Sequence, residues 1–353
     1  MLTLVLAIAI ISLLILVHEW GHFYSARKLG VKVEEFGFGF PPKIFSFVKH
    51  GVRYSLNLLP LGGFVKIFGE HGEGEDQKSS FAGRATWQRF VILAAGVFMN
   101  FVLAWVFFSI GAGLGTPKIS EEPGAPVSIL GVMPDSPAKV VGLRLGDQIL
   151  EMRGRDLTLR IESEDNVRDF TDAYRGEEIT LLIRRGEEVR EVKVTPRAVS
   201  PQGEGPLGVA LGRLSIEKSP WYLAPVDGFK TLVITTTATV QGLYSIGRDL
   251  LVQGRTQAAV SGPVGIFMFA QESRVLGLSF FLQFIGILSV NLAILNFLPI
   301  PALDGGRILF LALEKIKGRK ISPHVENLVH TIGFVVLILL MLFVTYKDLA
   351  RIF

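Results

Sequence analysis

Four stretches of the chain are apolar for long enough to cross a bilayer as a helix, which takes about 20 residues. They cover residues 1–23, 90–114, 278–303 and 328–346. The first stretch has no basic segment before its apolar run and no small-residue cleavage site after it. We therefore predict a retained helix there and not a signal peptide.

Two further stretches are apolar but weaker. Residues 223–251 are rich in Thr and interrupted by Gly, which favours an amphipathic or interfacial helix over a span. Residues 261–270 are short and contain Gly and Pro, so we expect a loop or re-entrant piece. Residues 220–275 are thus predicted to join two parts of a membrane domain, 1–114 and 278–353.

The interval between the first two spans has strand character. Residues 36–42 are too apolar for a solvated loop, and residues 54–67 are rich in strand formers around Pro60–Gly63. This pattern predicts a β-hairpin within residues 31–69. Because it is apolar and lies beside two spans, we expect it to enter the bilayer edge.

Residues 124–212 predict a small β-rich module. Strand-like runs separated by turn residues cover 127–132, 148–153, 179–184 and 189–194, and a short helix is expected from Pro137. The fold class is therefore an α-helical integral membrane protein with about four transmembrane helices, a membrane-associated hairpin and an inserted β-rich domain.

Charge places these parts relative to the membrane. Lys and Arg gather between the first and second spans and between the third and fourth, so these loops are predicted to be cytoplasmic. The module and both termini then lie outside the cytoplasm.

The net charge is only +4 and the basic residues are scattered, which gives no indication of a nucleic-acid-binding surface. The chain has no Cys, so a metal site would have to use His and carboxylates.

The first span ends in His18-Glu19-Trp20-Gly21-His22. Two His residues four apart share one helix face and can bind one Zn²⁺, and the Glu beside them can act as general base. A polar group that merely extends to the membrane surface would explain one of these residues, but not two His residues spaced to meet.

A catalytic zinc needs a third protein ligand and an open position. The candidate is Asp304, which follows two prolines at the end of the third span. Both this span and the first run inward, so Asp304 and the His pair reach the same depth. The alternative is that Asp304 only caps the next segment. The remaining His residues, His330 included, and the acidic loop from Glu70 to Asp76 are expected to be solvated.

These motifs together resemble the site-2 protease family, most closely its bacterial regulator of sigma-E protease type. The resemblance rests on the HEWGH motif, the FGFG segment after it, the GGFVK run from Gly62 and the NFLPIPALDGG run from Asn296. It implies a zinc-dependent intramembrane endopeptidase in the bacterial inner membrane, with its active site near the cytoplasmic face. Its substrates would be transmembrane helices already shortened by another protease.

The resemblance also implies that Asn296 holds the substrate backbone, although the residue alone could equally bond to another helix. A helical substrate must unwind before attack, and we expect the hairpin edge around Gly62, Gly63 and Phe64 to pair with it. Such enzymes act in anti-sigma factor release or in clearance of signal-peptide remnants.

The module is similar to circularly permuted bacterial PDZ domains, through residues 135–138, 142–143 and 146–149. In that arrangement Leu207, Gly208 and Val209 would form the peptide-binding loop and strand, though they could equally be only a closing strand. Members of the protease type often carry two such modules, and this interval has room for one.

Two other classes of protein remain as alternatives. One is a non-catalytic membrane scaffold that binds peptides through the module. The other is a metal-binding or transport protein, which the shortage of polar residues in the other spans disfavours.

Overall fold

The computed structural model describes residues 2–119, 124–133, 135–201, 203–254, 262, 265–267, 270, 273 and 277–352. The chain divides into two compact units. The membrane unit comprises residues 1–110, 225–270 and 282–353, and the second unit comprises residues 111–224 and 271–281.

Four helices are long and apolar enough to cross a membrane, as the hydropathy pattern predicts. They are α1 (Leu2–Lys28), α2 (Thr86–Leu114), α7 (Leu278–Phe297) and α9 (Pro323–Ile352). The expected end of the third span at 303 is wrong, because α7 stops at Phe297. Pro299 and Pro301 lack the N–H groups that would continue the helix.

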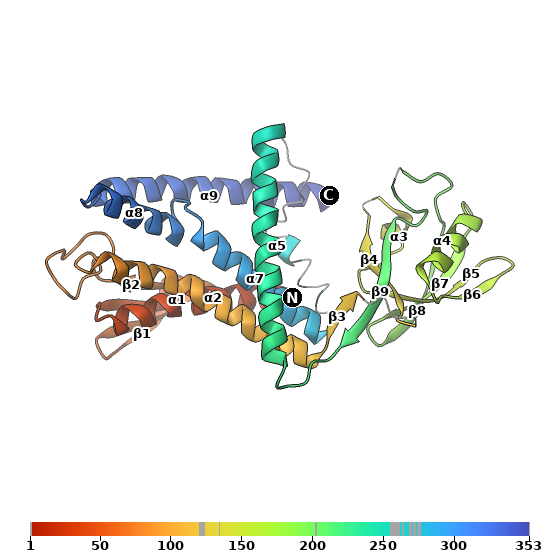
Figure 1. The fold of residues 1–353 in the computed structure, drawn as a ribbon, viewed down its shortest axis with the longest axis horizontal. Coiled ribbons are helices and arrows are strands. Elements are labelled where there is room, and N and C mark those ends of the chain that lie inside the picture. The colour runs from red at the N-terminus through yellow and green to blue at the C-terminus, as the bar shows by residue number, and fades with distance from the viewer. Residues whose placement is uncertain are drawn as a thin grey trace. The chain divides into compact units, whose positions relative to one another are not determined.

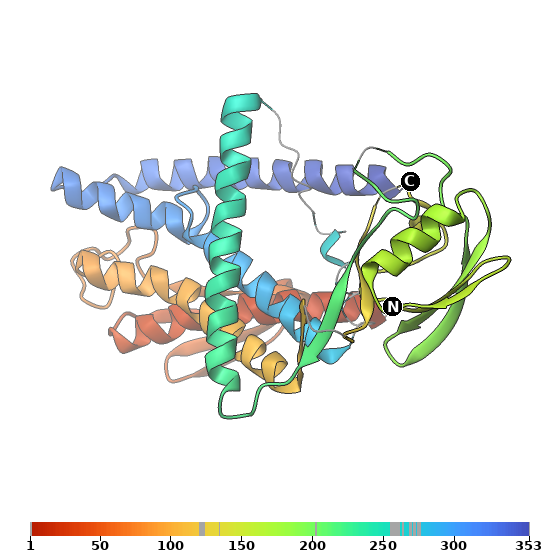
Figure 2. The ribbon, with the colours of Figure 1, turned by 45° about the vertical axis from the view of Figure 1, so that its right-hand side comes forward.

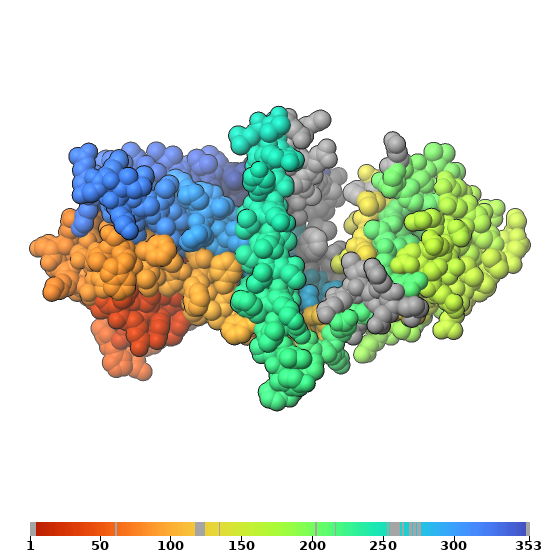
Figure 3. All heavy atoms as spheres, in the orientation of Figure 1, coloured from red at the N-terminus to blue at the C-terminus, as the bar shows by residue number. Residues whose placement is uncertain are grey.

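Helix α5 (Ala224–Gln253) confirms the predicted helix over residues 223–251 and is not among the candidate spans of the described chain. It runs crosswise to α2 and α9 in both ribbon views (Figures 1 and 2) and lies on the outside of its unit (Figure 3). Leu232 packs there against Phe108 of α2 and Val290 of α7. Several Thr hydroxyls donate to carbonyls of the preceding turn, which satisfies them within the helix. The predicted loop at 261–270 lies mostly outside the described residues.

The predicted hairpin within residues 31–69 is present, but its turn lies elsewhere than at Pro60–Gly63, and its long strands fold back on themselves. Strands β1 (Val33–Lys49) and β2 (Val52–Ile67) each bend. Residues 33–38 pair with 63–67 on one side, and residues 35–38 pair with 53–56 on the other. The two halves of residues 54–67 are therefore not partners, and residues 60–63 form a corner. The tight turn lies at His50 and Gly51, both with positive φ.

The second unit contains the predicted module. Its strands are β3 (Thr116–Ile119), β4 (Val127–Val132), β5 (Gln148–Arg153), β6 (Thr158–Arg160), β7 (Ile179–Arg185), β8 (Glu188–Val194) and β9 (Val209–Glu217). The sheet order is β3-β9-β4-β5-β7-β8, with β6 paired to β5. The short helix α3 (Pro137–Val140) is present, and α4 (Glu164–Ala173) was not predicted.

Alternating apolar residues of these strands build the core of the module. The most buried of these strand side chains are Val127, Ile129, Ile149, Met152, Ile179, Leu181 and Ile183. Helix α4 is started by a capping box between Ser163 and Asn166, and Phe170 packs it onto the core. The module thus has a core of its own, apart from that of the membrane unit.

Candidate metal centre

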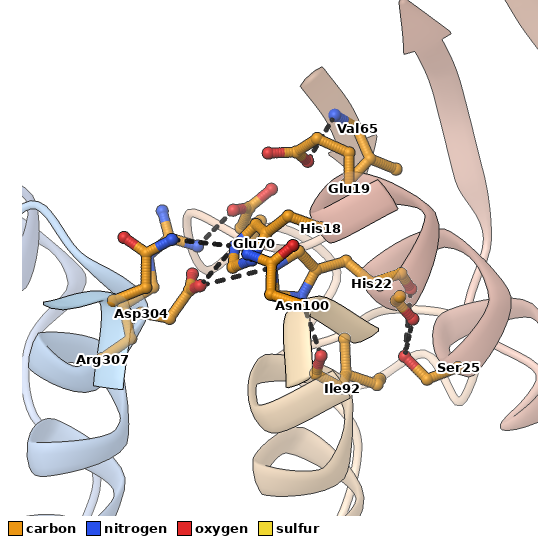
Figure 4. A network of polar contacts seen from close by, with 12 residues as sticks. His18, Glu19, His22, Ser25, Val65, Glu70, Ile92, Asn100, Asp304 and Arg307 are labelled. Carbon is orange, nitrogen blue, oxygen red and sulfur yellow. Dashed lines mark hydrogen bonds and ion pairs between the residues drawn. The ribbon is translucent and has the colours of Figure 1, made fainter. Parts of the chain in front are cut away.

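The three predicted metal ligands converge in the membrane unit (Figure 4). His18 Nε2 lies 2.9 Å from Asp304 Oδ2, and His22 Nε2 lies 3.4 Å from the same oxygen. The two Nε2 atoms are 3.2 Å apart. Within the described chain this is the one group of three or more such side chains placed to hold an ion.

Helix α2 orients both imidazoles. His22 Nδ1 lies 2.8 Å from the carbonyl oxygen of Ile92, and His18 Nδ1 lies 3.2 Å from the side-chain amide of Asn100. Each Nδ1 is therefore turned away from the centre, and each Nε2 is left to face it. Metal-binding His residues commonly have a partner of this kind on the other ring nitrogen.

Two glycines allow α1 and α2 to approach closely at this point. A Cβ added to Gly21 would lie 2.3 Å from the carbonyl oxygen of Ala95, and one added to Gly96 would lie 2.3 Å from His22 Nε2. Any side chain at Gly96 would therefore occupy the space between the two imidazoles and α2.

Asp304 is the first residue of α8 (Asp304–Lys317) and reaches the centre directly after the turn that follows α7. This turn is held from α9, because the N–H of Ala302 donates to His330 Nδ1 at 2.9 Å and Gly333 lies directly against Pro301. Ala302 has a φ of +78°. The expectation that His330 is a solvated surface group is therefore wrong.

Burial raises the pKa of the Asp304 carboxyl, but without a metal the protonated imidazoles of His22 and His18 outweigh burial and hold the pKa well below its ordinary value. Asp304 is thus an anion, the form that binds a metal.

The residues present fit zinc. Two imidazole nitrogens and one carboxylate oxygen are ligands that a catalytic zinc accepts. Ligands about 2.1 Å from a tetrahedral ion lie about 3.4 Å from one another, close to the three separations found here. Because Gly96 has no side chain, both imidazoles can lie directly against α2.

Glu19 lies at the junction of two cavities. One has a volume of about 160 Å³ and is lined by Glu19, His22, Phe64 and Asp304. The other has a volume of about 280 Å³ and is lined by His18, Glu19, Asn296 and Asp304. The Glu19 carboxylate accepts a hydrogen bond of 3.1 Å from the N–H of Val65 in β2. Space for a substrate therefore exists on both sides of the metal ligands.

The predicted hairpin residues border this space. The corner at Gly62 has a φ of +105° and packs against Ile15 of α1, and Gly63 lies beside the Cγ of Glu19. Ser12 of α1 donates to the carbonyl of Pro60 at 2.6 Å. Among described residues, no strand pairs with the edge of 63–67 that faces away from β1.

The acidic loop contributes one residue to the site, contrary to expectation. Glu70 forms an ion pair with Arg307 of α8, and both line the smaller cavity with Glu19. Glu70 is therefore not merely part of a solvated turn.

The predicted peptide loop belongs to the second unit. Leu207, Gly208 and Val209 line a cavity of about 310 Å³ together with Val167 and Thr171 of α4. Gly208 has a φ of +69°, and an added Cβ would lie 2.4 Å from Ser136. This groove needs α4, the element that the sequence did not reveal.

Sequence reasoning also missed Gly96 and Asn100. They lie four apart in α2, so they share a face, and a buried Asn in an apolar span is an unusual residue. A Gly and an Asn at this spacing in an apolar span are the sequence feature that could have identified both residues.

The chain is similar to known proteins over nearly its whole length. Residues 6–340 match the family model described as Peptidase family M50. A Clostridium perfringens protein whose name describes a zinc metalloprotease is 33% identical over 349 residues, which cover 98% of each chain. The zinc metalloprotease RasP of Oceanobacillus iheyensis is 29% identical over 439 aligned positions, which cover all of both chains.

Part of the chain is similar to solved structures, a Listeria domain among them. That domain is the PDZ domain of an SdrC-like protein from Listeria monocytogenes, with 23% identity and a TM-score of 0.21, and it aligns with 27% of this chain and 92% of its own.

Proposed function

We infer that this chain, which belongs to peptidase family M50 and is a zinc metalloprotease, hydrolyses peptide bonds within transmembrane segments of other membrane proteins. The observation that carries the proposal is the position of the candidate metal ligands. His18 and His22 lie in a helix that is itself a candidate span, and cavities open on both sides of them. A substrate helix would have to enter the bilayer region to reach them.

The residues at the site suit hydrolysis. His18, His22 and Asp304 would hold zinc, which when bound activates a water molecule and polarises the substrate carbonyl. Glu19 accepts a proton from this water as its oxygen bonds to the carbonyl carbon. When the carbon–nitrogen bond breaks, Glu19 delivers the proton to the leaving amine. Asn296 faces the larger cavity, where its side-chain amide can hydrogen-bond the substrate backbone.

The experiment compares wild type with Glu19→Gln on a helical reporter substrate in liposomes, with the zinc content measured in parallel. Gln keeps the shape of Glu but cannot accept the proton. Cleavage should fall by about 10²- to 10⁴-fold, and zinc should be retained. An unchanged cleavage rate would instead favour a scaffold or a metal transporter.

The unpaired edge of residues 63–67 supports a way of holding an unwound substrate. A substrate strand could add to this edge, and the N–H of Val65 would then exchange its bond to Glu19 for one to the substrate. Gly62 and Gly63 permit the corner that brings this edge to α1, and Phe64 lines the cavity beside it.

The groove of the second unit supports peptide binding. Strand β9 is bonded to β4 along residues 209–213, and no described strand occupies its other edge there. We expect the full-length protein to bind a peptide with a free carboxylate more tightly than the same peptide amidated, because loop amides capture the carboxylate. Equal binding of both would leave residues 207–209 as a closing strand only.

For this multi-pass membrane protein we propose a place in the bacterial inner membrane. The distribution of Lys and Arg supports an active site near the cytoplasmic face, with the module and both termini outside. The module then serves as a filter or tether for substrates that another protease has shortened. Anti-sigma factor release and clearance of signal-peptide remnants are reactions of this kind.

A further inference from the structure

We propose that Asn100 is a positioning residue for the metal centre, which fixes the zinc-binding tautomer of His18 by accepting a hydrogen bond from its Nδ1–H. This proposal depends on zinc binding at His18 and not on the identity of the substrate.

The first step is the tautomer of His18. Its Nε2 lies 2.9 Å from Asp304 and 3.2 Å from His22 Nε2, so Nε2 is the nitrogen that would bind an ion held by the three side chains. A neutral imidazole that binds a metal through one nitrogen carries its proton on the other. The partner of Nδ1 must therefore be an acceptor.

The second step concerns the side chain that meets Nδ1. Asn100 is fully buried in α2, and its Nδ2 lies 3.2 Å from His18 Nδ1. With zinc on Nε2 this arrangement would place two donors face to face. The amide oxygen and nitrogen occupy interchangeable positions. Since Oδ1 is buried without a partner in the described chain, a half turn of the amide brings an acceptor to Nδ1 and breaks no bond of Oδ1.

The third step is the parallel with the second His ligand. His22 Nδ1 meets the carbonyl oxygen of Ile92, an atom that can only accept. Helix α2 would therefore supply one acceptor oxygen to each imidazole. A fixed tautomer and ring orientation strengthen metal binding, and loss of such a partner costs about 10- to 100-fold in affinity.

A purely structural role for the Asn100 side chain can be separated from this one. The bond that links α2 to α7 at this point runs from Ser289 Oγ to the backbone carbonyl of Asn100, at 2.8 Å. Substitution of the side chain leaves that bond in place.

The test measures zinc affinity of purified full-length protein in detergent, by competition with a chelator. Asn100→Leu keeps the approximate shape and removes the acceptor, so zinc should bind about 10- to 100-fold more weakly. Asn100→Asp keeps the acceptor and should bind zinc at least as tightly as wild type. The matched control is Asn291→Leu in α7, which removes an amide that meets Thr239 of α5 and should leave zinc affinity unchanged.

Two outcomes would overturn the proposal. One is wild-type affinity in Asn100→Leu, and the other is an equal loss in Asn100→Asp and Asn100→Leu, which would mean that the amide donates.

A second measurement needs no variant of Asn100. In ¹⁵N spectra of the zinc-loaded wild type, His18 Nδ1 should carry a proton, and a proton-free Nδ1 would contradict the assignment. Zinc affinity is read without any cleavage, so failure here is distinct from failure of the proposed protease substrate class.

Discussion

At the scale of single residues, the metal centre depends on Gly96, because this position has no side chain. The space beside His22 exists because position 96 of α2 is Gly. We predict that Gly96→Ala weakens zinc binding, because the added methyl group would lie 2.3 Å from His22 Nε2. Overpacking of this kind costs about 1–3 kcal/mol, so zinc affinity should fall by about 5- to 150-fold.

Gly113→Ala is the matched control in the same helix. A Cβ there would meet only Ala224 at 3.7 Å, an ordinary contact, so zinc affinity should not change. If both variants lost zinc equally, the effect would come from helix α2 as a whole and not from crowding at the centre.

The residues of the metal centre were predictable to different degrees. His18, Glu19 and His22 lie within one turn of one helix, so their spacing alone brings them together, and the matched depth of two spans suggested Asp304. Glu70 and His330 act through partners 237 and 28 positions away. The sequence around Glu70 and His330 does not indicate these distant partners. Each residue was therefore expected to be solvated.

At the scale of elements, the edge of residues 63–67 should matter for cleavage more than the rest of the sheet. Val65→Pro removes the N–H that meets Glu19 and would meet a substrate strand. We predict loss of cleavage of a helical reporter with the zinc content retained.

Val48→Pro is the control, because residues 43–49 form the opposite edge of the same sheet. This variant should keep most of the cleavage activity. A similar loss in both variants would show that the sheet needs only to be intact, and strand addition would then be contradicted.

Elements with a strong local pattern were predicted well, and their pairing was not. Strands β4 and β5 have the predicted bounds, because turn residues bracket each apolar run. The corner at 60–63 was interpreted as a hairpin turn, since Gly and Pro indicate a change of direction but not which strand lies alongside. Helix α4 is short and largely polar, so its apolar periodicity was missed despite its capping box.

At the scale of the whole molecule, the module should act on substrate choice and not on chemistry. We predict that deletion of residues 124–212 permits cleavage of substrates that have not been shortened first. The structure favours this deletion, because residues 116–119 of β3 pair with 214–217 of β9, so that Ile119 and Leu214 lie side by side.

The deleted chain carrying Glu19→Gln should be inactive, which assigns the new cleavage to the same site. If the deleted chain kept the selectivity of the full chain in a cleavage assay, a filter role for the module would be ruled out.

The two cavities beside Glu19 also have a consequence for inhibitor chemistry. A hydroxamate or similar zinc-chelating group at His18 and His22 would have two directions in which to grow. An arm toward Leu292 and Asn296 meets an aliphatic surface with one amide, whereas an arm toward Glu70 and Arg307 meets a charged pair. A compound with an apolar arm and a polar, uncharged arm that can hydrogen-bond Glu70 and Arg307 would engage both surfaces. Its selectivity over soluble zinc proteases would come from groups outside the shared metal chemistry.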